Sequence, residues 1–219
     1  FTIVLDAQPA SDVVLTITSS DTGEATVNSP LTFTAANWNT PQTVTVTGVN
    51  DNLVDGTITS TVTVAVNDGS SDNNFDPVAD QTVSVSTTDN DTAGFTITET
   101  GGSTAVAETG TTDTFAVVLT AQPSSDVVLS ITSGDTGEAV VNGSTGSNNI
   151  LTFTSGNWNT PQSFTVTGVD DNLVDGTITS TLTVAVVDAL SEDSFDAVAD
   201  QTVSATTTDN DTAGFTITE

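Results

Sequence analysis

A long internal repeat limits how this chain can fold. The segment LDAQPASDVVLTITSSDTGEATV, which begins at Leu5, recurs as LTAQPSSDVVLSITSGDTGEAVV from Leu119. A second block, NWNTPQTVTVTGVNDNLVDGTITSTVTVAV from Asn37, recurs from Asn157. The spacing grows from 114 to 120 residues because six residues are inserted in the Gly, Ser and Asn-rich stretch 142–149, which has the chemistry of a surface loop. A repeat of this length has the size of a domain and not of a solenoid turn.

The repeat also sets the expected domain boundaries. DNDTAGFTITE occurs from Asp89 and again from Asp209, so one complete unit spans about residues 95–214. The copy before it has no counterpart of segment 95–114. We therefore predict three parts: a sandwich that lacks its first strand at 1–94, a complete sandwich at 95–214, and at 215–219 the first strand of a following repeat or a donated strand.

Short runs rich in Thr, Val, Ile and Phe predict β-strands throughout each unit. In the complete unit we expect strands near residues 95–98, 114–119, 126–133, 138–142, 151–154, 162–169, 177–187 and 201–208. Val127, Leu129 and Ile131 share one face of the predicted strand, as do Leu182, Val184 and Val186 of a later one, so we expect one face of each strand to be buried. With Gln-Pro, Asp-Gly and Asn-Gly turns between the runs, the sequence predicts an all-β chain of tandem immunoglobulin-like antiparallel β-sandwiches that needs no helix.

The charge of the chain excludes several partners. It contains 29 Asp and Glu and no Lys, Arg or His, which gives a formal net charge of −29. Such a chain repels nucleic acid phosphates and anionic headgroups, so we expect neither as a direct partner. There is no starting Met, no basic leader and no apolar run as long as a membrane span. We expect a mature protein or an internal fragment, extracellular, with no membrane insertion in this segment.

The carboxylates of the second unit gather at predicted strand ends. The segments are VAETG with Glu108, VDDNLVDG with Asp170, Asp171 and Asp175, and TTDNDTAG with Asp209 and Asp211. If these loops converge at one pole of a sandwich, the like charges need a counter-ion. Ca²⁺ binds about 6–8 oxygens in flexible carboxylate loops, and without His or Cys soft metals are disfavoured. An isolated Asp is usually a turn former, but three clusters at repeating positions favour an ion site.

These three segments resemble the Calx-β domain and its bacterial tandem-repeat relatives. In that family a V-x-E-x-G segment opens the domain, D-D-x-x-x-E/D follows a central strand, and a D-D-D-like segment closes it. The resemblance implies that Ca²⁺ binds at one end of the second sandwich through Glu108, Asp170, Asp171, Asp175, Asp209 and Asp211. The corresponding first-unit residues are Asn50, Asp51, Asp55, Asp89 and Asp91. Because Asn50 replaces an acid, we expect fewer ions there. The Asp-Tyr pair before the central strand of many relatives has no counterpart.

Other candidate sites have structural explanations. Trp38 and Trp158 both lie in NWNTPQ and could form a sugar-stacking platform. We favour a structural role, because each follows an LTFT strand and precedes a Pro turn, where it can close a core edge. Glycosylation sequons begin at Asn90, Asn142 and Asn210, and we expect only the one at Asn142 to be free.

The available side chains disfavour catalysis. Without His, Cys, Lys, Arg or Tyr, only carboxylates and hydroxyls remain for acid–base or nucleophilic chemistry. We expect a non-enzymatic structural protein of the cell surface, a fibre or adhesin stalk whose tandem sandwiches Ca²⁺ stiffens at DNDTAG junctions. The alternative is a module that binds surface polysaccharide or a receptor through its Trp-bearing edge or the 142–149 loop. Near identity of the units favours the first hypothesis, because a spacer needs repetition.

The missing strand predicts how copies of the chain meet. Without a counterpart of the FTIT strand at 95–98, the first sandwich should have an open edge. Residues 215–218 repeat that strand. If the chain is the true subunit, this strand adds to the first unit of the next copy, head to tail, and a filament grows. If the chain is a window of a longer tandem protein, which we favour, neighbouring repeats of the same chain make that contact.

Overall fold

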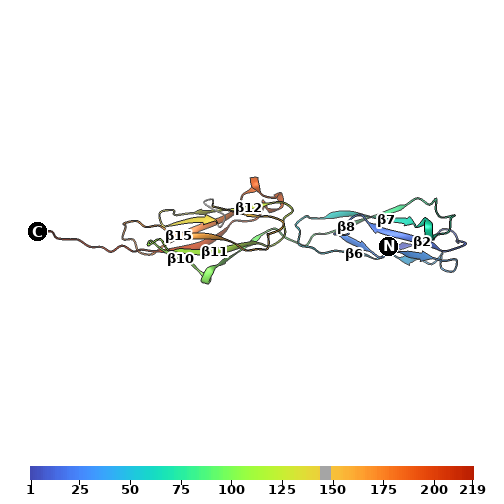
Figure 1. Cartoon of the computed structure of the whole chain (residues 1–219), viewed down its shortest axis with the longest axis horizontal. Helices are drawn as coiled ribbons and strands as arrows, with labels where there is room; N and C mark the ends of the chain where they lie inside the picture. The colour runs from blue at the N-terminus through green and yellow to red at the C-terminus, as the bar shows by residue number, and fades with distance from the viewer. Residues whose placement is uncertain (144–148) are drawn as a thin grey trace. The chain divides into compact units, whose positions relative to one another are not determined.

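The structure, a computed structural model, describes residues 1–143 and 149–219 (Figure 1). Within these ranges the regular elements are β-strands and short 3-10 turns, so the predicted all-β class is confirmed. None of the helical turns in the described ranges has the length and hydrophobicity of a membrane-spanning helix. The chain divides into two compact units, residues 1–51 with 55–90, and residues 52–54 with 91–219. Most of the inserted stretch 142–149 lies outside the described residues.

The first unit is built from one main sheet and two strand pairs. Its elements are β1 (Thr2–Ile3), β2 (Val13–Ser19), β3 (Ala25–Val27), β4 (Leu31–Phe33), β5 (Gln42–Thr43), β6 (Val46–Gly48), β7 (Ile58–Val66), η1 (Asp68–Ser70) and β8 (Gln81–Thr87). The main sheet has the order β4-β2-β7-β8, while β1 pairs with β5 and β3 pairs with β6. Val13 and Phe33 belong to one small core cluster, and Ile17, Val44 and Val62 form a second.

The second unit is a complete two-sheet sandwich. Its elements are β9 (Phe95–Glu99), η2 (Thr100–Gly102), β10 (Thr104–Ala107), β11 (Thr112–Leu119), β12 (Val127–Ser133), β13 (Ala139–Gly143), β14 (Ile150–Phe153), β15 (Gln162–Gly168), β16 (Ile178–Val186), η3 (Asp188–Leu190), η4 (Asp193–Phe195) and β17 (Gln201–Thr208). The sheets have the orders β10-β17-β16-β12-β14 and β13-β15-β11-β9.

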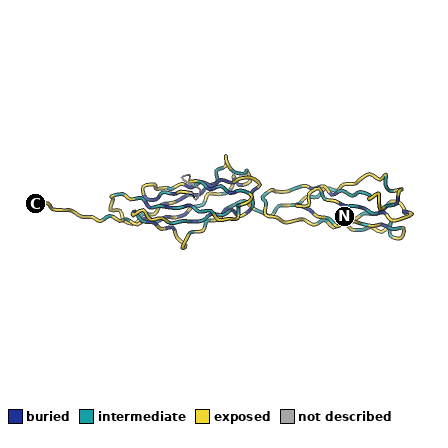
Figure 2. The backbone as a smooth tube through the Cα atoms, in the orientation of Figure 1, coloured by how far each residue is buried: buried dark blue, intermediate teal, exposed yellow. Residues whose placement is uncertain are grey.

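One continuous core lies between these two sheets. Phe115 and Phe164 come from one sheet, with ring centroids 5.6 Å apart, and Leu129 and Leu182 come from the other. All four side chains are fully buried. Figure 2 shows the buried residues concentrated along the strands of this unit, with exposed residues in its loops and at the C-terminal end of the chain.

The expected strands of the second unit are present, and one further strand was not predicted. This strand, β10, runs parallel to β17, with Thr104 opposite Ala205 and Ala107 opposite Thr208. Its sequence, TAVA, is too short and too rich in Ala to give a strand signal. The other strand pairs are antiparallel, so the expected antiparallel pattern is incomplete at this edge. The immunoglobulin-like type of the sandwich remains a prediction.

A glycine marks where β10 packs. A Cβ placed on Gly168 would lie 2.1 Å from the carbonyl oxygen of Ala107, so only glycine admits the backbone of β10 at this distance. The corresponding glycine of the first unit, Gly48, has only Thr87 Cγ2 near its Cβ position, at 3.8 Å. The sequence of the first unit contains no counterpart of β10.

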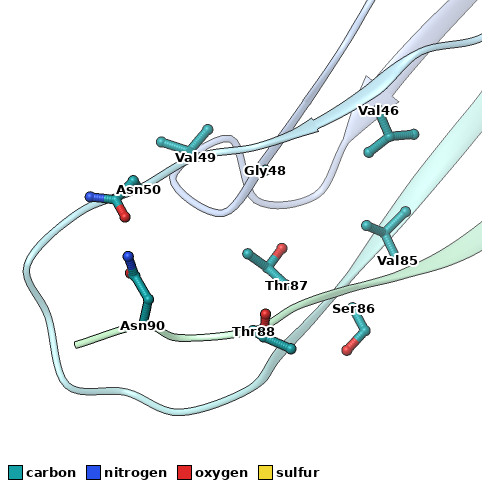
Figure 3. Close-up of a pocket in the computed structure, with 9 residues that line it drawn as sticks. All are labelled: Val46, Gly48, Val49, Asn50, Val85, Ser86, Thr87, Thr88 and Asn90. Atoms are coloured by element: carbon teal, nitrogen blue, oxygen red, sulfur yellow. The ribbon is translucent and has the colours of Figure 1, made fainter. Parts of the chain in front are cut away.

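An open pocket occupies that position in the first unit. Figure 3 shows Val46, Gly48 and Val49 on one side and Val85 and Thr87 on the other. The pocket has a volume of about 540 Å³.

Candidate functional site

Acidic residues of the second unit meet where several strands begin or end. Glu108 follows β10, Glu138 precedes β13, Asp171 and Asp175 follow β15, and Asp209 and Asp211 follow β17. Three groups of these residues bring one carboxylate oxygen from each member within 4.8 Å of the others. The groups are Glu108 with Asp175 and Asp209, Glu108 with Asp171 and Asp211, and Glu138 with Asp171 and Asp175. Because the groups share members, we treat these six residues as one second-unit acidic cluster.

Asp209 organises the loops of this cluster. Its Oδ2 accepts hydrogen bonds from the backbone N–H groups of Asp175, at 3.0 Å, and Gly176, at 2.8 Å. Its Oδ1 accepts a third from the N–H of Asp211, at 2.6 Å. The N–H groups of Gly176 and Asp211 are the main reason that the pKa of Asp209 lies below its usual value. Asp209 therefore stays ionised and holds two loops together.

Glu108 and Glu138 are the buried members of the cluster, with 1% and 6% of their surfaces exposed. The backbone carbonyl of Glu138 accepts hydrogen bonds from the N–H of Val169, at 2.8 Å, and the hydroxyl of Thr207, at 3.2 Å. These bonds fix the backbone from which the Glu138 side chain extends. Glu108 Oε2 accepts the N–H of Asn210 at 3.1 Å. Both carboxylates are thus removed from water, and that of Glu108 is held by the backbone of Asn210.

Two oxygens of the cluster are buried without a partner. Among the described residues, Glu138 Oε2 and Asp211 Oδ2 are inaccessible to solvent and accept no hydrogen bond. A buried polar atom without a hydrogen bond is unfavourable, and an uncompensated carboxylate more so. The sequence has no Lys, Arg or His that could supply a positive side chain. Glu138 and Asp211 belong to different groups, so a cation in each group would compensate these two carboxylates.

The pKa values of three acids in the cluster are raised by burial and by repulsion between neighbouring carboxylates. Burial, followed by repulsion from Asp175, raises the pKa of Glu138. Burial and then Asp209 raise the pKa of Asp211. For Glu108, the N–H of Asn210 lowers the pKa, but burial and the neighbouring carboxylates outweigh it and the net shift is upward. Without a counter-ion, burial and the neighbouring carboxylates disfavour the ionised forms of Glu108, Glu138 and Asp211, and a multivalent cation opposes these upward pKa shifts.

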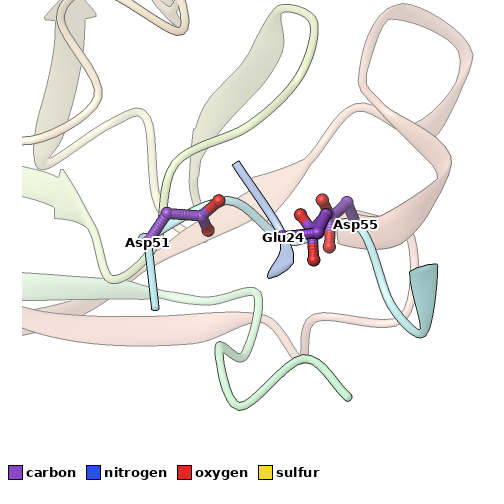
Figure 4. A group of neighbouring side chains, drawn as sticks. All are labelled: Glu24, Asp51 and Asp55. Carbon is purple, nitrogen blue, oxygen red and sulfur yellow. The ribbon is translucent and has the colours of Figure 1, made fainter. Parts of the chain in front are cut away.

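The first unit has a smaller group, which consists of Glu24, Asp51 and Asp55 (Figure 4). One carboxylate oxygen of each lies within 4.8 Å of the other two. Burial and then Asp55 raise the pKa of Glu24, while burial and then Asp51 raise the pKa of Asp55. Asp89 accepts the N–H groups of Asp55, at 3.2 Å, and Gly56, at 3.0 Å, as Asp209 does in the second unit. The same loop arrangement therefore occurs in both units, but the acidic group of the first unit contains fewer acids than the second-unit acidic cluster.

The structure brings most of the predicted residues together. The predicted residues that fall into the groups are Glu108, Asp171, Asp175, Asp209, Asp211, Asp51 and Asp55. Metal binding by them remains a prediction.

The other predicted residues lie outside the groups in the described part of the chain. Asp170 accepts a hydrogen bond from Asn210 Nδ2 at 2.7 Å, and Asn50 Nδ2 donates to the carbonyl of Asp51 at 3.0 Å. Asp89 supports the Asp55 loop, and Asp91 belongs to the second unit.

Sequence reasoning missed Glu24 and Glu138. Both occur in the repeated segment DTGEA, directly before a strand, at Glu24 before β3 and Glu138 before β13. An acid at the same strand end in both copies was the signal that could have identified them. Neither residue lies in a segment that resembles the Calx-β motifs, so the motifs alone could not identify them.

The tryptophans contact the protein itself. Trp158 is partly buried against the core of the second unit, and its carbonyl accepts the N–H of Leu119 at 3.2 Å. The Trp38 carbonyl accepts the N–H of Leu5 at 3.1 Å. The packing of the Trp158 side chain favours the structural interpretation for that residue, whereas the hydrogen bond of Trp38 is made by its backbone. Asn142 is exposed, but Ser144 of its sequon lies outside the described residues.

Comparison with known proteins gives remote structural likenesses. No family model matches the chain, and a search of curated proteins finds no match. The S-layer protein SbsC domains 4 and 5 align with a TM-score of 0.41 at 18% identity, over 89% of this chain and 70% of that one. SbsC domains 1–6 align with a TM-score of 0.42 at 18% identity, over 90% of this chain and 20% of that one. CBD12 from CALX1.2 aligns with a TM-score of 0.30 at 12% identity, over 84% of this chain and 71% of that one. At these levels the likenesses assign neither a family nor a function.

Proposed function

We propose that this chain is an extracellular structural repeat protein whose units bind Ca²⁺ at their acidic loops. The observation that carries the proposal is the second-unit acidic cluster around Glu138, a carboxylate that is only 6% exposed and has an unpartnered Oε2. Two further acids, Asp171 and Asp175, each place an oxygen within 4.8 Å of it. A chain without a basic side chain can neutralise this cluster only with protons or cations.

The ligand set suits calcium better than other common ions. Every group contains only carboxylates, which disfavours metals that prefer nitrogen or sulfur. Ca²⁺ accepts about 6–8 oxygens in irregular geometry, whereas Mg²⁺ requires a regular octahedron and keeps its waters. Shared members such as Glu108 and Asp171 can bridge neighbouring ions. We expect the second unit, with six acids in overlapping groups, to bind more Ca²⁺ than the first, with three.

A structural role agrees best with the rest of the molecule. Two nearly identical units suit a spacer, in which each copy performs the same mechanical task. Ca²⁺ that joins three or four loops would stiffen a stalk or fibre at the cell surface, where millimolar Ca²⁺ fills even weak sites. No His, Cys or Lys is present for catalysis. The proposal also includes head-to-tail association, either between copies of this chain or between neighbouring repeats of a longer one.

Thermal unfolding tests the binding claim. The ion-free chain should melt at a higher temperature after Ca²⁺ is added, because an ion that binds the folded state stabilises it by mass action, about 2.7 kcal/mol at a concentration 100 times Kd. Mg²⁺ at equal ionic strength should raise the melting temperature less. A melting temperature that does not respond to Ca²⁺ would overturn the proposal.

Small-angle scattering tests the mechanical claim. We expect the whole chain to show less conformational variation in Ca²⁺ than in chelator. Identical scattering profiles in the two buffers would remove the ion from any stiffening role, even if the melting temperature responds to it.

A further inference from the structure

The sequence contains three Asp–Gly pairs, and the structure exposes all of them to solvent. They are Asp55–Gly56, Asp68–Gly69 and Asp175–Gly176. Such a pair can isomerise spontaneously, because glycine has no side chain to hinder attack by its backbone nitrogen on the carboxyl carbon of the preceding Asp. The new N–C bond closes a succinimide, and the N–H proton and the carboxyl OH leave as water. Water then opens the ring, and one of the two products is isoaspartate.

Isomerisation would damage the acidic loops of both units. Asp55 belongs to the acidic group of the first unit and Asp175 to the second-unit acidic cluster. In isoaspartate the main chain runs through the former side chain, so the backbone gains one carbon and the remaining carboxylate loses one. Neither loop could then keep its carboxylate oxygens within 4.8 Å of those of its neighbours. The two loops therefore need protection from this reaction.

Replacement of the glycine cannot provide that protection in the acidic loops. Gly56 has a φ of +75° and Gly176 a φ of +79°, a conformation that residues with a Cβ adopt at a cost. The φ of Gly69 lies outside this region, and a Cβ there would meet only Asn67 Oδ1, at 3.9 Å. The corresponding residue of the second unit is Ala189. Glycine is thus required in both acidic loops but not at residue 69.

A carboxylate holds the attacking nitrogen in each acidic loop. The N–H of Gly56 donates to Asp89 Oδ2 at 3.0 Å, and the N–H of Gly176 donates to Asp209 Oδ2 at 2.8 Å. Among the described residues no carboxylate accepts a hydrogen bond from the N–H of Gly69. The two pairs whose glycine is required are therefore the two whose nitrogen is bound by an acid.

This hydrogen bond opposes the reaction in two ways. The nitrogen must lose its proton as it attacks, and a carboxylate that accepts the N–H stabilises the protonated form and repels the negative charge that develops. The nitrogen must also turn toward the carboxyl carbon, and a fixed peptide plane keeps it from the required geometry. Both effects operate without a bound ion.

We propose that Asp89 and Asp209 protect the Asp–Gly pairs of the acidic loops from isomerisation, and that Asp68 is the Asp–Gly site at which the folded chain is modified. The inference goes beyond the proposed function, because the protection comes from carboxylates of the chain and does not depend on Ca²⁺. It gives these two acids a chemical role beside their role in holding the loops. A structural protein that remains outside the cell for a long time would benefit from it.

Peptide mapping of the aged chain tests the proposal. The ion-free chain is incubated in chelator at near-neutral pH, and mass spectrometry that distinguishes aspartate from isoaspartate measures each position separately. We expect isoaspartate at residue 68 to exceed that at 55 and at 175 roughly tenfold, the scale of one hydrogen bond to a charged group. Gly69→Ala should remove the product at 68 and leave the melting temperature nearly unchanged, because its Cβ enters open space.

Removal of each carboxylate tests its protective role. Asp209→Ala should raise isoaspartate at residue 175 roughly tenfold and leave residue 55 as in the parent, while Asp89→Ala should do the reverse. Each variant thus carries its own reference in the other unit. Gly168→Ala is the control for loosening of the second unit, because it strains β10 but keeps the Asp209 carboxylate. It should leave residue 175 protected. Circular dichroism checks that each variant is folded during incubation.

Three outcomes would overturn the proposal. The first is equal isomerisation at the three Asp–Gly pairs of the parent chain. The second is unchanged isomerisation in both Asp89→Ala and Asp209→Ala. The third is an equal rise at residue 175 in Gly168→Ala and Asp209→Ala, which would assign the protection to the rigidity of the unit and not to the carboxylate. Because every incubation is done in chelator, none of these results depends on whether the chain binds Ca²⁺, which the melting temperature reports.

Discussion

Glu138 and Asp175 each place a carboxylate oxygen within 4.8 Å of the other, and Asp175 is, after burial, the main cause of the raised pKa of Glu138. Both acids lie beside adjacent strands, since Glu138 precedes β13 and Asp175 lies in the loop after β15. Two carboxylates held this close destabilise an empty site and form part of a ligand set in an occupied one. Removing either charge should therefore lower the stability of the folded chain when the ion is bound and leave it unchanged or raise it when the site is empty.

Glu138→Gln tests this relationship, because glutamine keeps the shape of the side chain and removes its charge. In millimolar Ca²⁺ we expect the melting temperature to fall by several degrees, since a buried ligand is lost. In chelator we expect no fall or a small rise, since repulsion from Asp175 is relieved. Asp175→Asn should behave in the same way.

Asp200→Asn is the matched control for Glu138→Gln. Asp200 is an exposed acid outside the acidic groups, and its replacement makes the net charge less negative by the same amount. We expect similar melting temperatures for this variant and the parent in both buffers. Equal destabilisation of Glu138→Gln in Ca²⁺ and chelator would mean that Glu138 has a purely structural role.

Asp209→Asn should give a different pattern from Glu138→Gln. Asp209 accepts three backbone N–H groups, so its charge stabilises the loops whether or not an ion is bound. We expect a lower melting temperature in chelator as well as in Ca²⁺, measured by circular dichroism. A variant that is destabilised only in Ca²⁺ would show that Asp209 acts as a ligand and not as a loop anchor.

The ion-free chain should lose stability as the pH rises through the mildly acidic range. The pKa values of Glu24, Glu108 and Glu138 are raised above the ordinary glutamate value of 4.5. A raised folded-state pKa gives stability that is complete below the unfolded-state value and disappears as the pH passes the folded-state value. Asp209, with its lowered pKa, acts oppositely, because its contribution is lost below its ordinary value of 3.8.

Calcium should offset this loss, because it binds ionised carboxylates. We expect the difference in melting temperature between Ca²⁺-bound and dialysed ion-free protein to grow from about pH 4.5 to about pH 7.5. Calorimetry at a series of pH values measures it. A difference that shrinks as the pH rises would contradict the assigned pKa directions.

Gly168→Ala tests the packing of β10 beside the cluster. Its new Cβ would lie 2.1 Å from the Ala107 carbonyl oxygen, so β10 must move, at a cost of about 1–3 kcal/mol or more. The matched variant Gly48→Ala meets only Thr87 Cγ2, at 3.8 Å, and should leave stability nearly unchanged. Scanning calorimetry that finds the two variants equally stable would place β10 elsewhere.

The sequence was sufficient for the fold class and for most strands because alternation is strong in runs such as VVLSITS and ITSTLTVAV. It was insufficient for β10, whose position depends on a tertiary contact between Ala107 and Gly168 and not on its own propensity. A first-unit groove that Leu5 and Phe75 help to line was visible only in the structure, because its lining residues are far apart in the sequence.

The candidate site was predictable only in part for a similar reason. The loops that carry Asp171, Asp175 and Asp209 can be recognised in the sequence because each contains several acids close together. Glu24 and Glu138 are single acids in a turn sequence, and their importance depends on burial and on which loops the fold brings beside them. Asp170 shows the converse case, since an acid next to Asp171 in sequence instead accepts a hydrogen bond from Asn210.

Isothermal titration of the ion-free chain with Ca²⁺ tests the central claim most directly. We predict saturable binding of more than one Ca²⁺ per chain, because each unit contains an acidic group. Glu138→Gln should reduce the number of ions bound or weaken the tightest class, while Asp200→Asn should bind as the parent does. Absence of saturable binding at millimolar Ca²⁺, or unchanged binding by Glu138→Gln, would contradict the proposal that the buried cluster is a calcium site.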